Sequence, residues 1–490
     1  MADSGSELFD TIIIGAGIAG LNTAYRIQSS FPNHKYAILE SRASLGGTWD
    51  LFRYPGIRCD SPMHMFNFAW RPWTSDIAIA SGADILKYLR ESAAVTGIDQ
   101  KIMYGHRLVR ANWSSENAHW HLTVDTSGGQ KQLYTRWIVI CTGYYSYADP
   151  ADIHIPGIEN FAGRVIRPQF WPQDYDYANK HIAVIGSGAT AVTLVPELAK
   201  KAAKVTMLQR SPTYIIPFPT ISPISAALKH YLPAWLVSQI ARLWGLLQTY
   251  FILKACKKNP SKWAGLMKQD MARQLPSRIP VDPHFLPKYN PWQQRLCIAP
   301  DGDFFEALRS GKADVFTDSI ARVSGSGIEL ASGTTLQVDD IIVATGLRLE
   351  IAGNYQLSID GEEFKIGGTF FWRSLMLKDV PNLGLMIGYS DQSWTVGIEI
   401  GAKVFCRVLS LMRKRGVTIA VPRMSEDEMR DIKKTELLDL TSTYVVEGLD
   451  QLPKGGDKQP WKPKESYMWD WWVARWANLE KGLELSGGGI

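Results

Sequence analysis

The stretch Gly15-Ala16-Gly17-Ile18-Ala19-Gly20 follows an apolar run over residues 9–14 and decides the fold of the first part of the chain. The run predicts a strand buried on both faces, and the spaced glycines predict a tight turn into the amino terminus of a helix. Residues 36–40 predict the next strand and end in Glu40, twenty residues beyond Gly20. An acid at that place accepts hydrogen bonds from a ribose diol. The stretch therefore predicts a βαβ unit that binds a dinucleotide.

A second glycine turn, Gly186-Ser187-Gly188-Ala189-Thr190-Ala191, precedes a helix predicted to run to residue 200. Ala191 takes the place of the third glycine, which this fingerprint tolerates, although a plain strand-to-helix connection is a stronger alternative here than in the first unit. Arg210 follows the next predicted strand, at the position where the first unit has Glu40, and an arginine there suits a 2′-phosphate. The two turns thus predict one dinucleotide with a free ribose diol and one of the NADP type. FAD that takes hydride from NADPH fits that pairing.

The predicted fold class is α/β, with two Rossmann-like dinucleotide-binding domains and the NADP domain inserted into the FAD domain. Two apolar segments, residues 137–143 and 340–346, both end in Thr-Gly and are expected where the chain crosses between the domains. The expected boundaries are 1–146 and 341–460 for the FAD domain, 147–214 and 286–340 for the NADP domain, 215–285 for a helical insertion, and 461–490 for a Trp-rich tail.

The composition is that of a globular protein, with 490 residues, 46% hydrophobic residues and a net charge of +5. No basic run is long enough to predict a nucleic-acid partner. Five cysteines show neither metal-ligand spacing nor a disulfide framework, so we expect no metal and a reducing, cytoplasmic location. The polar start of the chain over residues 1–7 does not resemble a signal peptide.

Two apolar segments allow two interpretations each. Residues 243–253 are too few to span a bilayer; we favour a helical insertion that covers the active site over an interfacial amphipathic patch. In the tail, Trp469, Trp472, Val473 and Trp476 fall on one helical face. Such a stripe is more often core or a subunit contact than a membrane anchor, so peripheral membrane association is not the favoured prediction. The oligomeric state is not predicted.

Residues 46–60 are the most specific segment of the sequence. Gly46-Gly47 permits close approach of two backbones, and Trp49 offers a flat apolar surface for a ring system. Arg58 and Asp60 place opposite charges at the end of the segment. A surface loop with a satisfied ion pair is the alternative, and composition alone does not decide between the two.

The same segment resembles the long fingerprint of the flavin-dependent Baeyer–Villiger monooxygenases: Gly-Gly-x-Trp, four residues, Tyr-Pro-Gly, three residues, Asp. A second fingerprint of that family matches at Phe161, Gly163, Trp171 and Pro172, but Arg167 stands where the family has histidine. The pattern is most similar to the subgroup of mycobacterial monooxygenases that activates thioamide prodrugs. The shared stretches are residues 49–58, 186–196, 209–214, 289–292 and 294–297.

The resemblance implies a role for individual residues. FAD would be held by Gly15, Gly17, Ala19, Gly20, Glu40, Thr48, Trp49 and Asp60, with the Leu108 backbone near the adenine. NADP would be held by Gly186, Ser187, Gly188, Ala189, Thr190, Ala191, Val192, Arg210 and Ser211, with Arg58 close by. Gly47, Leu51 and Cys59 complete the cofactor-binding set. Arg295 occupies the place of the catalytic arginine, assisted by Asp60, although a salt-bridged surface arginine is the alternative without the resemblance. Gln294 replaces a lysine that often contacts the 2′-phosphate, which leaves more of the NADPH preference to Arg210.

The implied activity is oxidation of a ketone to an ester or lactone with NADPH and O2, through a C4a-peroxyflavin. The alternative is S- or N-oxygenation of a sulfide or other soft heteroatom with the same cofactors. A flavin disulfide reductase is disfavoured because the sequence has no Cys-x-x-Cys. Arginine at 167 keeps hydrogen bonding but cannot become neutral, so we expect activity to persist with altered coupling of NADPH use to oxygenation.

Overall fold

The structure is a computed structural model that describes residues 7–438 and 440–488. The glycine turn at residue 15 lies in a nine-stranded sheet whose order is β20-β19-β4-β5-β6-β1-β2-β3, with β23 paired to β6. Its strands are β1 (Leu8–Ile14), β2 (Tyr36–Glu40), β3 (Ile102–Tyr104), β4 (Arg107–Ser114), β5 (His119–Thr126), β6 (Gly129–Ile140), β19 (Gln356–Ile359), β20 (Glu362–Glu363) and β23 (Leu383–Leu385). The predicted βαβ unit is present, because β1 runs parallel to both β2 and β6 and its isoleucines are fully buried.

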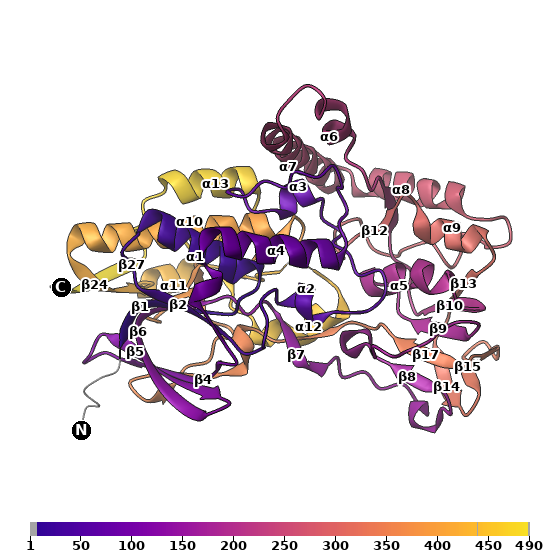
Figure 1. Ribbon diagram of the computed structural model, residues 1–490, viewed down its shortest axis with the longest axis horizontal. Helices are drawn as coiled ribbons and strands as arrows, with labels where there is room; N and C mark the ends of the chain where they lie inside the picture. The colour runs from indigo at the N-terminus through magenta and orange to yellow at the C-terminus, as the bar shows by residue number, and fades with distance from the viewer. Residues whose placement is uncertain (1–6, 439, 489–490) are drawn as a thin grey trace.

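Helices cover one face of this first sheet (Figure 1). They are α1 (Ile18–Ser30), α4 (Gly82–Thr96) and α10 (Trp394–Arg415), with the short α2 (Thr48–Leu51) and α3 (Met63–Phe66) between them in sequence. Buried side chains of α1, α4 and α10, such as Leu21, Leu89 and Phe405, form one core with Ile13 of β1. Burial of this apolar area is what holds the carboxyl end of β1 and the amino end of α1 in a fixed relation.

The second glycine turn lies in a separate five-stranded parallel sheet of order β13-β10-β9-β17-β8. The strands are β8 (Arg164–Ile166), β9 (His181–Ile185), β10 (Lys204–Gln209), β13 (Ala313–Thr317) and β17 (Asp340–Val343), and the helices beside them are α5 (Ala189–Ala199) and α9 (Asp303–Arg309). A three-stranded meander follows, made of β14 (Ile320–Ser324), β15 (Gly327–Leu330) and β16 (Thr335–Gln337).

The second sheet is inserted into the first, as the sequence predicts. Strands of the first sheet come from residues 8–140 and from residues 356–385, and all strands of the second sheet lie between them in the chain. The outgoing β7 (Tyr145–Pro150) and the returning β18 (Leu347–Leu349) pair antiparallel, so the two crossings form one two-stranded link. Strand β17 belongs to the second sheet and extends three residues past the expected boundary at residue 340.

The segment that interrupts the α/β pattern is helical, with α6 (Pro223–Leu228), α7 (Ala234–Lys258) and α8 (Pro260–Gln274). Strands β11 (Ile215–Phe218) and β12 (Cys297–Pro300) pair in parallel where this insertion leaves and rejoins the second domain. The buried guanidinium of Arg242 on α7 donates to the carbonyl oxygens of His64, Met65 and Asn67. These bonds fasten the insertion to α3 of the first domain.

The remainder of the chain packs on the first domain. It comprises β21 (Phe371–Trp372), β22 (Met376–Leu377), β24 (Val417–Pro422), α11 (Glu426–Asp431), β25 (Lys434–Thr435), α12 (Thr443–Gly448), the 3₁₀ turn Leu449–Gln451, β26 (Gly455–Gly456), α13 (Tyr467–Trp476) and β27 (Leu483–Gly488). The interpretation of the α13 stripe as core is wrong: Trp469, Trp472 and Trp476 are exposed, whereas Asp470 and Ala474 are buried. Among the described residues, no helix combines the length and the hydropathy needed to traverse a bilayer.

Candidate active site between the two nucleotide folds

Each glycine turn abuts the strand end that carries Thr-Gly in its own domain. A Cβ on Gly15, whose φ is +103°, would lie 2.8 Å from the carbonyl oxygen of Cys141. A Cβ on Gly186, whose φ is +135°, would lie 2.3 Å from the carbonyl oxygen of Ala344. Only glycine fits either position, both for its positive φ and for the close approach. The repeated Thr-Gly segments are thus the partners of the two turns.

Both turns present a helix amino terminus without a side-chain cap. Helix α1 begins after Gly17 and α5 begins after Gly188, and neither cap residue offers a side chain to the first-turn N–H groups. Uncapped N–H groups at the positive end of a helix bind a pyrophosphate well. The carboxylate of Glu40 is fixed beside the first turn, because it accepts from the backbone N–H groups of Ala16 and Arg42, both at 2.9 Å. These features fit the diphosphate and ribose of a dinucleotide.

The segment from Gly46 to Asp60 joins the two turns. At its start, the Gly46 N–H donates to the carbonyl oxygen of Ala16 at 3.0 Å. Further along, the Tyr54 side chain hydrogen-bonds to that of Thr190 in the second turn. A Cβ on Gly56, whose φ is +74°, would lie 2.2 Å from Cγ of Glu197 on α5. The fingerprint segment therefore spans from one nucleotide fold to the other.

The first part of that segment forms α2 at the mouth of the first turn. Thr48 Oγ1 and the Tyr147 hydroxyl are 3.2 Å apart, and the Trp49 ring meets Phe66 edge-on at 5.5 Å. Asp50 is buried and forms ion pairs with three arginines, at 2.6, 3.2 and 3.4 Å (Arg42, Arg53 and Arg90). This unpredicted Asp50 cluster fixes α2, and with it the position of Thr48 and Trp49.

The second part of the segment carries the charges. Arg58 does not pair with its sequence neighbour Asp60 but with Asp303 of α9, at 2.6 Å, and its other nitrogen donates to the Ile298 carbonyl oxygen. The loop interpretation with an Arg58–Asp60 ion pair is therefore wrong. Removal from water raises the pKa of Asp60 to about 6, against the opposing effects of Arg58 and of Arg295.

Arg295 reaches across to the first domain. Its Nη2 donates to the Tyr144 hydroxyl at 2.7 Å, and its guanidinium carbon lies 5.9 Å from the centroid of that ring. Tyr144 in turn stacks on Trp394 at 4.7 Å. Trp394 is the first residue of α10, so Tyr144 links the second domain's arginine to the amino end of a helix in the first domain. This contact puts a guanidinium where the two folds meet.

Three buried hydroxyl groups occur on the segments that make this contact. The Oγ atoms of Thr142, Ser393 and Thr395 have no hydrogen-bond partner among the described residues. Thr142 lies two residues before Tyr144, and Ser393 and Thr395 flank Trp394. Buried hydroxyl groups without a partner are rare, and a polar ligand at this place supplies the missing bonds. The residues present thus fit a flavin ring system between the two folds.

Comparisons with known proteins agree with this geometry. A family model described as pyridine nucleotide-disulphide oxidoreductase matches residues 12–225. The chain is similar to the FAD-containing monooxygenase EthA of Mycolicibacterium smegmatis, with 41% identity over 477 residues, which are 97% of this chain and 96% of that protein. It is also similar to the FAD-containing monooxygenase EthA of Mycobacterium tuberculosis, with 42% identity over 484 residues and 98% of both chains. The chain belongs to the family of FAD-containing monooxygenases.

A solved structure has the same fold as this monooxygenase. An oxidized steroid monooxygenase bound to NADP superposes with a TM-score of 0.76 and 19% identity, over 98% of this chain and all of the other. The likeness shows the architecture of two nucleotide folds, one inserted into the other. It confirms the predicted fold class and, with the relatives above, the predicted resemblance.

Beside the glycine turn of the second fold, this monooxygenase exposes Arg210 and Ser211. Ser187 Oγ donates to the Ser211 carbonyl oxygen at 2.9 Å, and Arg210 Nη2 lies 3.5 Å from Thr443 Oγ1. Gln294 is half-buried next to Arg295. Arg210 is thus an exposed cation at the carboxyl end of β10, the position where a ribose phosphate would lie.

The other residues implied by the resemblance take more indirect positions. Leu108 is buried in β4, and the preceding His106 N–H donates to the Glu40 carbonyl oxygen, so this strand begins beside the end of β2. Burial raises the pKa of the Cys59 thiol to about 12, so that side chain remains neutral; its Sγ accepts from the Ser61 N–H at 3.4 Å. Arg167 Nη1 donates to the Ala151 carbonyl oxygen in the segment that follows β7, within the connection between the domains.

Sequence reasoning missed Asp303, Tyr144 and the Asp50 cluster. For Tyr144 a signal existed, because it directly follows the Thr-Gly end of a strand that was expected where the chain crosses between the domains. Asp303 gave no signal, since the contact with Arg58 joins residues 245 positions apart.

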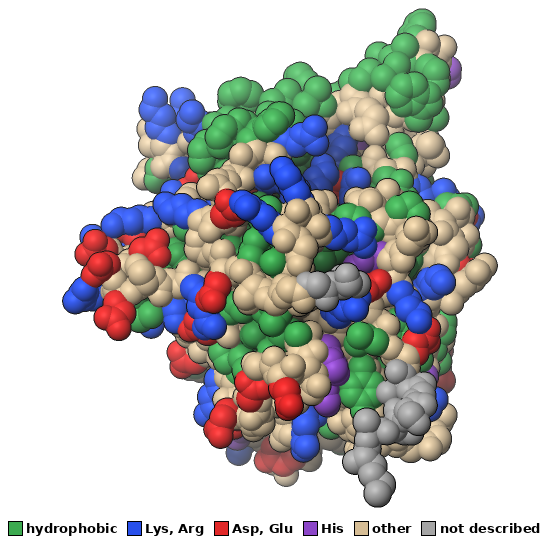
Figure 2. All heavy atoms as spheres, turned by 90° about the vertical axis from the view of Figure 1, so that its left-hand side faces the viewer, with side chains coloured by type: hydrophobic (Ala, Val, Ile, Leu, Met, Phe, Trp, Pro, Cys, Tyr) green, Lys and Arg blue, Asp and Glu red, His purple; other side chains and the backbone are tan. Residues whose placement is uncertain are grey.

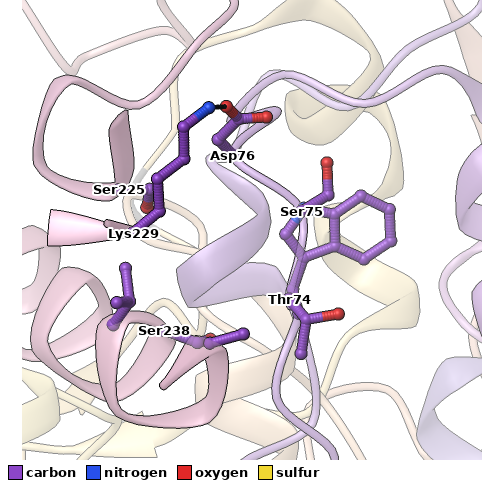
Figure 3. A pocket seen from close by; sticks show the side chains of 9 residues that line it. Thr74, Ser75, Asp76, Ser225, Lys229 and Ser238 are labelled. Carbon is purple, nitrogen blue, oxygen red and sulfur yellow. Dashed lines mark hydrogen bonds and ion pairs between the residues drawn. The ribbon is translucent and has the colours of Figure 1, made fainter. Parts of the chain in front are cut away.

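A cavity of about 190 Å³ lies under the helical insertion, away from these residues (Figure 3). It is lined by the loop of residues 73–76 and by α6 and α7, and the Asp76 carboxylate and Lys229 Nζ form an ion pair across it at 2.7 Å. None of the predicted cofactor or catalytic residues lines it.

The raised pKa of Asp60 predicts a pH dependence of stability. The folded protein binds this proton more tightly than the unfolded chain does, so ionisation of Asp60 lowers stability as the pH rises from 3.8 to about 6. Asp60→Asn cannot ionise, and its thermal midpoint should rise relative to that of the wild type across this window. Asp303→Asn is the comparison, because it removes the carboxylate that pairs with Arg58. Burial raises the pKa of Asp303 as well, so its ionisation also lowers stability as the pH rises, and the loss caused by this substitution should be larger at the lower end of the window than at the upper. A midpoint difference between wild type and Asp60→Asn that is the same at both ends would contradict the assignment.

Proposed function

We propose that this chain is a Baeyer–Villiger monooxygenase that converts a ketone, O2, NADPH and a proton into an ester or lactone, NADP⁺ and water. FAD and NADPH are its cofactors. The observation that carries the proposal is the contact of Arg295 with Tyr144, which places a permanent cation at the junction of the two nucleotide folds. When bound there, FAD would carry two electrons from NADPH to O2, so that one oxygen atom of O2 enters the substrate and the other leaves as water.

The residues that hold the cofactors follow from the two turns. The uncapped amino terminus of α1 and the fixed Glu40 carboxylate bind the diphosphate and ribose of FAD, with Thr48 and Trp49 beside them. The amino terminus of α5, Arg210 and Ser211 bind NADPH. Tyr54 and Arg58 hold the first fold in a fixed position against the second, because both side chains contact residues of the second fold.

The chemical role of Arg295 is electrostatic. A ketone carbonyl that is attacked by a nucleophile gains negative charge on its oxygen, and a guanidinium nearby stabilises that charge. The Tyr144 hydroxyl fixes the direction of the guanidinium. Asp60 lies in the same charge cluster and, when ionised, compensates part of the field of Arg58 and Arg295.

The second candidate is S- or N-oxygenation with the same cofactors. Arg167 favours it, because this arginine replaces the histidine of the Baeyer–Villiger fingerprint and binds the Ala151 carbonyl oxygen between the domains. A fixed charge in that connection changes how the domains move against each other, and so how long the site stays closed. Heteroatom oxygenation makes a weaker demand on the stabilisation of a carbonyl oxyanion.

The experiment that separates the two candidates uses a panel of ketones and sulfides with ¹⁸O2. The holoenzyme is incubated with NADPH, and the products are analysed by mass spectrometry. An ester or lactone that carries one ¹⁸O atom supports the Baeyer–Villiger proposal. Labelled sulfoxides without any ester would favour the second candidate, and NADPH oxidation without any labelled product would overturn both.

Arg210→Ala should raise the KM for NADPH about 10- to 100-fold and leave the KM for NADH almost unchanged. The reason is that a hydrogen bond between charged groups contributes about 1.5–3 kcal/mol, and NADH lacks the 2′-phosphate. Steady-state kinetics with both nucleotides measure this. Arg322→Ala, which removes an exposed arginine of the same domain paired with Glu329, is the matched control. An equal change in both constants would remove Arg210 from the NADP site.

A further inference from the structure

Two helices at one edge of the molecule expose large apolar side chains. We define the apolar face as Leu243, Trp244 and Phe251 of α7 together with Trp469, Trp472 and Trp476 of α13. These side chains are between 43% and 63% exposed. Both helices lie along the same edge (Figure 1), and a space-filling view shows hydrophobic side chains gathered there (Figure 2).

The two helices belong to one surface. The Tyr467 side chain at the start of α13 packs on the small cluster formed by Met65, Leu246 and their neighbours, and Leu246 belongs to α7. Polar groups on the inward sides of both helices bind within the protein: Nη1 of Arg242 donates to backbone carbonyl oxygens, and Asp470 accepts from the Tyr389 hydroxyl at 2.7 Å. The apolar face therefore looks outward because the polar residues of both helices are held inside.

Within α7 and α13 themselves the exposed charges have one sign, although Lys257 pairs with Asp391 and the exposed Glu465 and Glu480 flank α13. Helix α7 contains no acidic residue and ends in Lys254, Lys257 and Lys258. The single acid of α13, Asp470, is buried. An apolar stripe with tryptophan and flanking lysines, and without exposed carboxylates, is the composition of helices that lie in the interface of a membrane.

A basic cavity of about 290 Å³ opens next to α13. Arg26, Lys403, Arg407 and Arg475 line it, together with Trp471. Glu399 forms ion pairs with Arg26 and Lys403. In the described part of the chain, neither Arg407 nor Arg475 has a carboxylate partner; Arg407 donates to the carbonyl oxygens of Ala474 and Ala477 instead. The cavity thus holds an excess of positive charge beside exposed tryptophans.

Burial, and then the neighbouring Arg475, lower the pKa of Arg407. Loss of water and a like charge nearby both lower the pKa of a cation that has no anion beside it. A phosphate group of a lipid headgroup carries the missing charge, and arginine binds phosphate with two parallel hydrogen bonds.

We propose that the apolar face and the basic cavity together dock this monooxygenase onto a bilayer surface that contains anionic phospholipids. The tryptophans of α13 and the aromatic residues of α7 enter the headgroup region, and the cavity takes a lipid phosphate. The inward face of α7 contacts α3, and Phe66 of α3 meets Trp49. Helix α3 thus connects the helix that carries the docked surface with the segment that carries Trp49. The proposal is independent of the reaction, because docking is measured without substrate.

The experiment is flotation of the full-length FAD-loaded protein with vesicles. One vesicle type is phosphatidylcholine alone and the other is phosphatidylcholine mixed with phosphatidylglycerol. The wild type should float with the mixed vesicles, more weakly with the neutral ones, and less as the salt concentration rises. Failure to float with the mixed vesicles would overturn the proposal.

Two variants test the two parts of the surface. Trp472→Ser with Trp476→Ser, and separately Arg475→Glu, should each lower binding to mixed vesicles about tenfold or more. The matched controls are Phe170→Ser, an exposed aromatic of the second domain, and Lys365→Glu, an exposed lysine after β20; both should bind like the wild type. Circular dichroism and the FAD content show that each variant is folded.

The competing occupant of the face is a second copy of the chain. Sedimentation velocity without lipid distinguishes it. If the wild type is an oligomer that the tryptophan variant dissociates, and vesicles are not bound, the proposal is overturned in favour of a subunit contact. Vesicle binding that Arg475→Glu leaves unchanged would overturn it as well, because the basic cavity is then not used.

Discussion

Arg295→Ala should abolish ester formation while NADPH oxidation continues. The variant keeps both glycine turns, the Glu40 carboxylate and Arg210. What it loses is the cation at the junction of the folds. Removal of one group that stabilises a developing oxyanion lowers kcat about 100- to 1,000-fold. Product analysis beside a measurement of NADPH absorbance separates the two reactions.

Two further variants test whether the loss of ester formation is specific to the Arg295 guanidinium. Tyr144→Phe keeps the guanidinium and removes the 2.7 Å hydrogen bond that directs it, together with the bond from the Tyr145 hydroxyl at 2.6 Å, so ester formation should fall less, by about tenfold. Arg348→Ala removes an exposed arginine of the interdomain link, paired with Asp149, and should leave both reactions near wild type. Ester output from Arg295→Ala equal to that of the wild type would end the assignment of this residue.

The sequence predicts the two nucleotide folds well because each is specified locally. Strand, glycine turn, helix and the residue at the next strand end lie within about thirty residues, so periodicity and spacing are enough. The junction between the folds is different. Arg295 and Tyr144 are 151 positions apart, and Arg58 and Asp303 are 245 positions apart. No local pattern encodes such pairs, and only the resemblance pointed to Arg295.

Helix α13 shows a second limit. Its periodicity correctly predicts a stripe of tryptophans, but periodicity does not say which side of an amphipathic helix faces the core. The structure turns Asp470 inward because the Tyr389 hydroxyl and two backbone N–H groups satisfy its carboxylate. Burial of a satisfied acid allows the tryptophans to stay outside. Position in the sequence could not reveal those partners.

The glycines of the two turns should divide into two classes when each is replaced by alanine. A Cβ on Gly20 would lie 1.9 Å from the carbonyl oxygen of Gly15, so the turn or α1 must shift. Alanine gains about 1 kcal/mol in helix propensity, but overpacking against backbone costs roughly 3 kcal/mol or more. We therefore expect Gly20→Ala to lower the thermal midpoint by several degrees and to lose FAD.

Gly188→Ala should behave in the opposite way. The backbone of Gly188 is extended, with φ of −79°, and a Cβ there has no protein atom within 4 Å. Alanine fits this position in the protein itself, so the thermal midpoint and the FAD content should stay near wild type. A dinucleotide diphosphate on α5 would meet the new methyl group, so the KM for NADPH should rise about tenfold or more, as for a lost charged hydrogen bond. If Gly188→Ala instead destabilised the protein and left the KM unchanged, the second turn would be only a connection between a strand and a helix, and the NADPH site would have to lie elsewhere.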